Sequence, residues 1–195
     1  MKLPVALFVA AAALLAGCAS RPASPPTREL AKPCGDCVPG VGNFAQVNEK
    51  LWRGSQPDPN GFRELAERGV KTVIDLRHDH DDFADLQGTN IHYLWLPMRA
   101  WHPEEEDMVL FLATLRRAFA DPARWPVYVH CAEGKDRTGY AIATYRIIEQ
   151  GWTPDDAIHE MFDFHYNPVW FGNPSFLSLL VQKRAELEDR VGRVP

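Results

Sequence analysis

Residues 127–139 read VYVHCAEGKDRTG, and this stretch decides the fold. The first four, Val127–His130, are rich in β-branched and aromatic residues and predict a short buried strand. A helical pattern follows over residues 138–150 and is ended by Gly151. The sequence therefore predicts a strand, a tight loop and a helix N-terminus in direct succession.

The loop has the residues of a phosphate-binding site. Backbone N–H groups at a helix N-terminus converge on one point, where the helix dipole adds positive potential. Arg137 can hold two phosphate oxygens with its planar fork, and Gly134 permits a left-handed turn. The same field favours the thiolate form of Cys131, a nucleophile toward phosphorus. Cys131 and Arg137 are thus predicted to be catalytic, and the predicted phosphate-binding residues are Ala132, Glu133, Gly134, Lys135, Asp136, Arg137 and Thr138.

Residues 130–139, HCAEGKDRTG, resemble the HCxxxxxR signature of the protein tyrosine and dual-specificity phosphatase superfamily. Residues 51–57 (LWRGSQP) and 69–77 (GVKTVIDLR) look like the opening of bacterial and of atypical plant and fungal members. This resemblance, over about residues 41–165, implies hydrolysis of phosphomonoesters through a phosphocysteine intermediate, without metal or cofactor. The implied substrates are phosphorylated proteins, lipids or inositol phosphates.

The general acid is predicted to be Asp136. Many relatives supply an aspartate from a Trp-Pro-Asp loop, but the corresponding residues 96–103 here, LPMRAWHP, contain none. Lipid-directed relatives whose signature ends in Lys-Asp-Arg or Trp-Asp-Arg use an aspartate at the position of Asp136. Asp107 and His102 are the alternatives, and Asp136 could instead be a carboxylate that orders the loop by pairing with Lys135 or Arg137.

The residue pattern leaves two other functions open. A weakly catalytic phosphate-binding lipoprotein is favoured by the missing loop aspartate, but binding alone requires no thiol. Rhodanese-like sulfur transfer also uses a cysteine in an anion-binding loop, although the pattern around His130 and Gly134 fits phosphatases better. For substrate choice, Trp101, Trp170 or Phe171 could wall a phosphotyrosine cleft, and Lys135 could help to bind a multiply phosphorylated molecule.

Strand and helix patterns alternate from Asn43 onward, which predicts an α/β fold. The expected architecture is a central, mostly parallel sheet of four to five strands flanked by helices, the cysteine-phosphatase fold. The functional site is expected at the carboxyl ends of the strands. A last helix is predicted from Asn173 to about Arg190.

The N-terminus predicts export. Residues 1–17 have the charge, apolar stretch and small residues of a signal peptide, and Leu15-Ala16-Gly17-Cys18 resembles a bacterial lipobox. Lipidation of Cys18 and a Pro-, Ala- and Ser-rich tether over residues 18–40 are therefore expected, with the phosphatase domain at 41–190. Cys34 and Cys37 are predicted to form a local disulfide. The expected location is the bacterial cell envelope, on the outer membrane facing the periplasm.

Charge excludes one class of partner. The chain of 195 residues carries a formal net charge of −5 and no long basic run, which argues against nucleic-acid binding. Residues 77–82, RHDHDD, contain metal-ligating types, but the sequence favours a solvated loop and no metal site. Asp75 and Arg77 are expected to order the edge of that loop.

Overall fold

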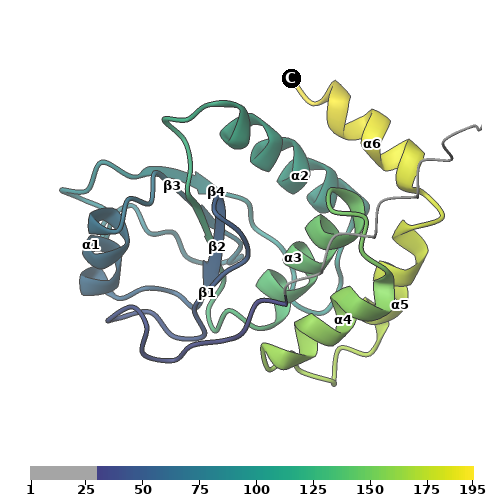
Figure 1. Ribbon diagram of the computed structural model, residues 1–195, viewed down its shortest axis with the longest axis horizontal. Coiled ribbons are helices and arrows are strands. Elements are labelled where there is room, and N and C mark those ends of the chain that lie inside the picture. Colours follow the sequence, from purple (N-terminus) through teal and green to yellow (C-terminus); the bar gives the residue numbers. More distant parts are fainter. Residues whose placement is uncertain (1–29) are drawn as a thin grey trace, which may run out of the picture.

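The computed structural model describes residues 30–195, which form a five-stranded sheet with helices on both faces (Figure 1). The strand order is β1-β2-β5-β3-β4; β2, β5, β3 and β4 are parallel, and β1 is antiparallel to β2. This confirms the predicted mostly parallel sheet flanked by helices. The elements are β1 (Ala45–Gln46), β2 (Leu51–Gly54), α1 (Pro59–Glu67), β3 (Thr72–Asp75), β4 (His92–Trp95), α2 (Glu105–Ala120), β5 (Val127–His130), α3 (Asp136–Ile148), α4 (Pro154–Asp163), α5 (Gly172–Leu180) and α6 (Arg184–Arg193).

Strand β5 lies at the centre of the sheet and positions the loop that follows it. Gly54 of β2 and Asp75 of β3 both pair in register with His130, the last residue of β5. Every residue of these three strands is buried, as expected for strands covered on both faces. The carboxyl ends of β2, β3 and β5 therefore meet beside Cys131.

Helices cover the sheet in unequal layers (Figure 1). Helix α1 packs on one face, where Phe62 and Leu65 join the strand residues Val73 and Tyr128 in a small core. Helices α2 and α3 form the larger core on the other face, and α4 and α5 pack on the outside of α3. Residues 138–148 of α3 are all buried, so the helix that carries the predicted phosphate site is held on every side.

Helix boundaries follow capping residues in the sequence. The Asp58 carboxylate accepts a hydrogen bond from Gly61 N at 2.7 Å, immediately before Pro59 at the start of α1. Thr153 caps α4 in the same way, ahead of Pro154. These starts depend on residues that are neighbours in the sequence.

The C-terminal region corrects a prediction. One helix was expected from Asn173 to about Arg190, but the structure has two, with a break at residues 181–183. After the break α6 runs along α2, where Lys183 and Arg190 form ion pairs with Glu105. Residues 181–183 include neither glycine nor proline, so tertiary contacts decide the break rather than local propensity.

Residues 31–40, which composition assigned to an extended tether, lie against the domain. Val38 is 1% exposed, and Ala31 N donates a hydrogen bond to Glu160 Oε2 at 2.9 Å. Cys34 and Phe44 exchange two backbone hydrogen bonds of 2.8 Å. Packing thus begins before residue 41. The predicted signal peptide, Cys18 and the rest of the predicted tether lie outside the described residues.

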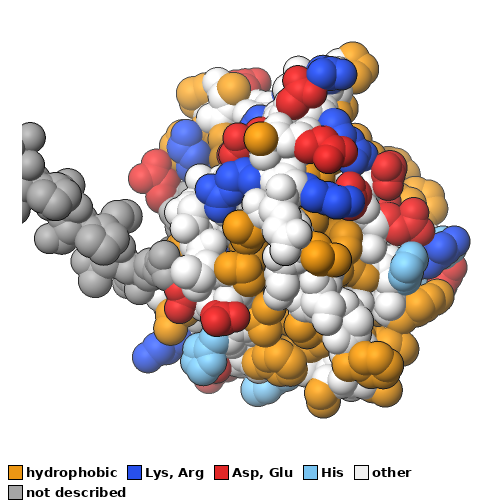
Figure 2. Space-filling model, turned by 90° about the vertical axis from the view of Figure 1, so that its right-hand side faces the viewer, with side chains coloured by type: hydrophobic (Ala, Val, Ile, Leu, Met, Phe, Trp, Pro, Cys, Tyr) orange, Lys and Arg blue, Asp and Glu red, His pale blue; other side chains and the backbone are white. Residues whose placement is uncertain are grey.

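The face formed by the C-terminal helices has two kinds of surface (Figure 2). Charged side chains of both signs mix over its upper part, and hydrophobic side chains gather over its lower part. Within residues 30–195, no helix has both the length and the apolar character needed to cross a bilayer. The large exposed hydrophobic residues between positions 160 and 185 are Phe162, Val169, Phe171, Leu179 and Val181.

Candidate active site

The loop after β5 leads directly into the N-terminus of α3. Asp136 is the first residue of this helix, and the side chain of the preceding Lys135 makes no capping hydrogen bond. The first N–H groups of a helix have no partner within it, and here no side chain caps the helix end. They are therefore available to an anion.

Gly134 is fixed by two steric requirements. Its φ of 69° lies in the left-handed region, and a Cβ atom would lie 2.5 Å from both the carbonyl carbon and the oxygen of Gly54. A side chain would therefore force the loop away from the end of β2. Glycine allows the loop to pack directly on the strand that neighbours β5.

The reactive groups are gathered beside this turn. Cys131 is a free thiol with 3% exposure. Among the described residues, Arg137 Nε and Thr138 Oγ1 are buried and have no hydrogen-bond partner. Buried donors are normally paired, so these two are available to an oxyanion bound at the loop or to the sulfur of Cys131.

Donors from the N-terminal half hold the carbonyl groups of the loop. Arg53 Nη2 donates to Gly134 O at 2.7 Å, and Gln56 N donates to Ala132 O at 3.1 Å. Arg53 is fully buried with its guanidinium 3.7 Å from the ring centroid of Phe164. Burial lowers the pKa of Arg53 to about 10, while the charges of Glu160 and Cys131 oppose that shift, so the side chain remains a cation at neutral pH.

His130 is oriented by a buried carboxylate. His130 Nε2 lies 3.0 Å from Asp82 Oδ2, and its Nδ1 lies 3.3 Å from Cys131 O. Asp82 also accepts hydrogen bonds from Gln56 Nε2 at 2.6 Å and from Arg77. Burial opposes ionisation, but the contacts with His130, Gln56 and Arg77 hold the pKa of Asp82 below its usual range. A fixed polar network therefore supports the backbone of Cys131.

This network corrects the prediction of a solvated loop over residues 77–82 at one position, Asp82; residues 78–81 are exposed, as predicted. Asp82 is 1% exposed, because the chain folds back so that it meets His130 under the loop. Arg77 binds Asp75 as well as Asp82, at the edge of the loop as expected. Asp75, Asp82 and His130 place ligand-type atoms close together, but the Arg77 cation contacts both carboxylates. That arrangement favours a structural network.

Asp136 is half-buried, and its Oδ1 accepts a hydrogen bond from Asn167 N at 2.9 Å. Its predicted partner Lys135 instead binds Glu133, with 2.6 Å between Nζ and Oε2. Asp136 is thus oriented by the segment after α4, and its assignment as the general acid stays a prediction.

The alternatives for the general acid lie at and before the start of α2. His102 is exposed. Asp107 is half-buried, and burial followed by the charges of Glu104 and Glu106 raises the pKa of Asp107, against the opposing charge of Arg99. A raised pKa keeps a carboxyl protonated over a wider pH range, which suits proton donation.

The predicted wall residues come from two segments, one of which is bonded to α3. Tyr140 of α3 donates to Arg99 O at 2.8 Å, and Asn173 Nδ2 donates to Ala100 O at 2.9 Å. These bonds bring residues 99–101 and 170–173 together, and the rings of Trp101 and Trp170 lie 6.2 Å apart. Trp101 is 59% exposed and Phe171 is 83% exposed, so two of the three predicted wall residues are largely outside the core.

The remaining cysteines lie in the N-terminal segment. The structure places Cys34 and Cys37 in a disulfide with a Cα–Cα distance of 5.7 Å. Cys131 is the free cysteine among the described residues.

The fold and the loop together define a cysteine phosphatase of the DSP-PTPase class. The chain belongs to the family described as "DSP-PTPase phosphatase fused to NAD+ Kinase", whose model matches residues 41–162.

Comparison with known proteins agrees with this class. The chain is 34% identical over 119 residues to the dual specificity protein phosphatase TpbA of Pseudomonas aeruginosa. The aligned region covers 61% of this chain and 53% of that protein. The chain therefore spans about half the length of this curated relative. It is also 25% identical over 125 residues to the inositol diphosphatase DSP5 of Arabidopsis thaliana, covering 60% of this chain and 59% of that protein.

Solved structures share the fold. The structure of a cysteine-to-serine form of P. aeruginosa TpbA in complex with pTyr superposes with a TM-score of 0.62 and 28% identity, covering 73% of this chain and 90% of that one. The catalytic core of the Saccharomyces cerevisiae PP-IP phosphatase SIW14 gives a TM-score of 0.63 at 22% identity, covering 78% and 96%.

Proposed function

We propose that this protein hydrolyses phosphomonoesters through a phosphocysteine intermediate on Cys131. The observation that carries the proposal is the loop itself. The free, buried thiol of Cys131 comes five residues before the uncapped N-terminus of α3, whose first turn carries two buried donors, Arg137 Nε and Thr138 Oγ1, that have no partner within residues 30–195. The thiol can attack the phosphorus atom of a phosphoryl group, and the N–H groups and the Arg137 guanidinium can bind its three equatorial oxygens.

The chemistry proceeds in two displacements. In the first, the Cys131 thiolate attacks phosphorus, the ester P–O bond breaks, and Asp136 gives its proton to the leaving oxygen. In the second, the Asp136 carboxylate takes a proton from water, the water oxygen attacks phosphorus, and the S–P bond breaks to restore the thiolate. Thr138 donates a hydrogen bond to the departing sulfur, and Arg137 holds the equatorial oxygens throughout.

The charges around the loop favour a substrate with one phosphate on an apolar group, such as phosphotyrosine. Lys135 is paired with Glu133, and Arg99 lies 3.3 Å from Glu104. Asp79 in the loop before Asp82 carries a further negative charge that interacts with Arg137. A polyphosphorylated inositol would need unpaired cations, whereas the exposed Trp101 can stack on an aromatic ring.

Phosphate release from three substrates tests this proposal. A phosphotyrosine peptide, a phosphatidylinositol phosphate and an inositol pyrophosphate are compared by kcat/KM with the full chain under reducing conditions. We expect kcat/KM for the phosphotyrosine peptide to be at least about tenfold higher than for the other two substrates. Each of those carries a further anionic group that would be left without a partner cation, and an unpaired group of this kind costs about that factor. Preference for the inositol pyrophosphate would instead overturn the substrate choice while retaining the phosphatase activity.

The pH profile tests the general acid. The acid must be protonated to donate, so the rate falls as pH rises through its pKa. Asp136→Asn is expected to lower kcat about 100-fold, which lies within the usual contribution of general acid catalysis. It should also remove the fall in rate at high pH, the basic limb of the profile. Asp107→Asn is the matched control, because burial and acidic neighbours raise the pKa of Asp107. Loss of the basic limb in Asp107→Asn alone would transfer the role to Asp107.

For location, we propose from the sequence a lipid anchor on Cys18 that attaches the protein to the bacterial outer membrane, facing the periplasm. The support is the lipobox-like stretch ending at Cys18, which lies outside the described residues. Loss of fatty-acid labelling in Cys18→Ser is the check.

A further inference from the structure

Asn43 has a left-handed backbone conformation, which is uncommon outside glycine but which asparagine adopts more readily than most residues. Its φ is 52°, and within residues 30–195 the other non-glycine residue with positive φ is His165, at 63°. The two residues are linked by one hydrogen bond. Asn43 Nδ2 donates to Phe164 O at 3.1 Å, and this carbonyl belongs to the peptide bond that joins Phe164 to His165. Left-handed conformations of this kind cost energy and persist where surrounding contacts compensate.

The same amide reaches the phosphate-binding loop. Asn43 Nδ2 lies 3.1 Å from Gly134 O and 3.3 Å from Glu133 O. Arg53 is a second donor to Gly134 O. In a trans peptide the C=O and the following N–H point in opposite directions. Holding the carbonyl groups of Glu133 and Gly134 outward therefore turns the N–H groups of Gly134 and Lys135 inward, toward an oxyanion on Cys131.

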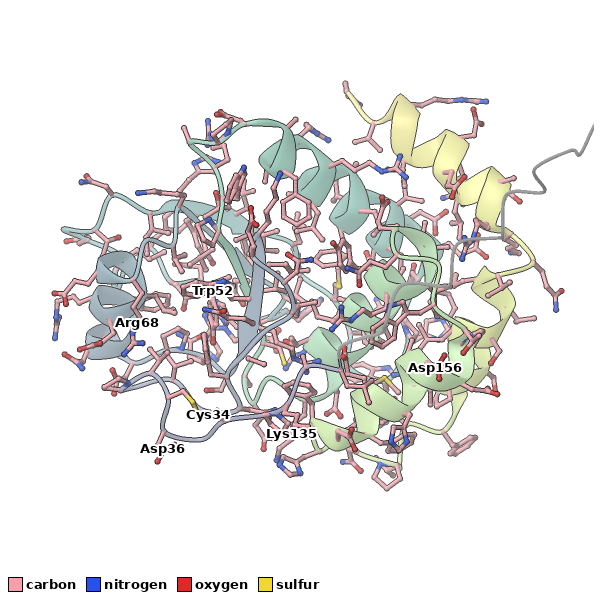
Figure 3. All side chains as sticks on the ribbon, viewed as in Figure 1. Cys34, Asp36, Trp52, Arg68, Lys135 and Asp156 are labelled. Carbon is pink, nitrogen blue, oxygen red and sulfur yellow. A yellow bond between two sulfur atoms is a disulfide. The ribbon has the colours of Figure 1, made fainter. Side chains whose placement is uncertain are left out.

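Asn43 is carried by a closed segment, residues 34–44, which we call the knuckle. It is closed by the Cys34–Cys37 disulfide, by a hydrogen bond of 3.0 Å from Val41 N to Val38 O, and by the paired bonds between Cys34 and Phe44. Figure 3 shows Cys34 of the knuckle and Lys135 of the loop at the same end of the domain. The knuckle thus fixes Asn43 through contacts that do not involve the loop.

We propose that Asn43 is a positioning residue that keeps the phosphate-binding loop in its N–H-inward conformation. Its effect on catalysis rests on the proposed function, but its effect on oxyanion binding can be measured separately. The residue does not touch the reacting atoms; it acts through the carbonyl groups of Glu133 and Gly134.

Two substitutions isolate the amide. Asn43→Gly keeps access to the left-handed backbone and removes the side chain, whereas Asn43→Asp keeps the size and replaces the N–H donors with an oxygen that repels three carbonyl groups. The dissociation constant of tungstate, a phosphate-like oxyanion, is measured by calorimetry on the full chain. Both variants are expected to bind tungstate about tenfold more weakly or worse, as for loss of a positioned hydrogen bond. The kcat/KM for an aryl phosphate should fall in parallel.

Asn48→Gly is the matched control. Asn48 is also an asparagine in a tight connection beside β1, where its amide binds Tyr145 Oη at 2.9 Å and its Oδ1 accepts from Lys50 N and Leu51 N. It does not contact the loop, so stability should fall while tungstate affinity stays within about twofold.

The outcomes separate the two proposals. Asn43 variants that bind tungstate like the wild type, with stability losses like that of Asn48→Gly, would show a merely structural role. Wild-type protein that binds tungstate but hydrolyses no phosphomonoester would overturn the proposed function, and the tungstate constants would still decide the role of Asn43. Wild-type protein that does not bind tungstate would overturn both.

Discussion

Replacing Cys131 with serine is expected to abolish phosphate release, lowering kcat by roughly four orders of magnitude or more, as for other catalytic nucleophiles. The serine hydroxyl stays protonated near neutral pH, and the ring nitrogens of the neighbouring His130 lie against Asp82 Oδ2 and Cys131 O, so His130 is not placed to act as its base. The substitution keeps the size of the side chain. The loop N–H groups, Arg137 and Thr138 should therefore still bind an oxyanion.

Two measurements check this result together. Phosphate release is followed in Cys131→Ser and in Ser178→Ala, a control whose exposed hydroxyl bonds Pro174 O on α5. Tungstate affinity is measured in both. Ser178→Ala is expected to match the wild type in both assays. Cys131→Ser is expected to match the wild type in tungstate binding only. Turnover by Cys131→Ser at the rate of the control would show that another group is the nucleophile.

Replacing Glu160 with alanine is expected to lower the free energy of unfolding by about 3–5 kcal/mol, the usual cost of removing one partner of a buried ion pair. The side chains of Arg146 and Glu160 are 3% and 2% exposed, with two contacts of 2.9 and 2.8 Å. Glu160 also accepts the hydrogen bond from Ala31 N. Without it, the Arg146 guanidinium over Trp152 stays buried without its counter-charge.

Urea denaturation with a fixed m-value measures this loss. Glu149→Ala is the matched control, because Glu149 at the end of α3 forms a partly exposed pair with Arg116 of α2, and such pairs contribute about 0–1 kcal/mol. The double variant Arg146→Met with Glu160→Leu should recover much of the stability, since it removes both buried charges. A loss in Glu160→Ala no larger than in Glu149→Ala would contradict the reasoning.

The parts of the site that a sequence can predict are those that lie together in the chain. Cys131, Gly134 and Arg137 occupy one strand–loop–helix unit, so their residue types, their spacing and the resemblance to the phosphatase signature together predicted the phosphate loop. The caps at Asp58 and Thr153 are local in the same sense. The sheet class followed because alternating strand and helix patterns have few compact arrangements.

The supporting residues could not be predicted because their partners are distant. Asn43 reaches Gly134, 91 positions away, and Asp82 reaches His130 from a loop of charged residues that reads as solvated. Arg53 lies within the LWRGSQP stretch, which was the available signal for its role. The break between α5 and α6 depends on the contacts of Lys183 and Arg190 with Glu105, which no local pattern encodes.

The position of β5 has a consequence for how the chain acquires its structure. The central strand is the last of the five in sequence, and it is inserted between β2 and β3, which do not pair with each other. A nascent chain that ends before residue 127 has β3 and β4 to pair, but nothing to join them to β2. Both ladders of β5 close long loops, which are entropically costly and slow to form. Binding of an oxyanion therefore indicates that β2, β3 and β5 have come together.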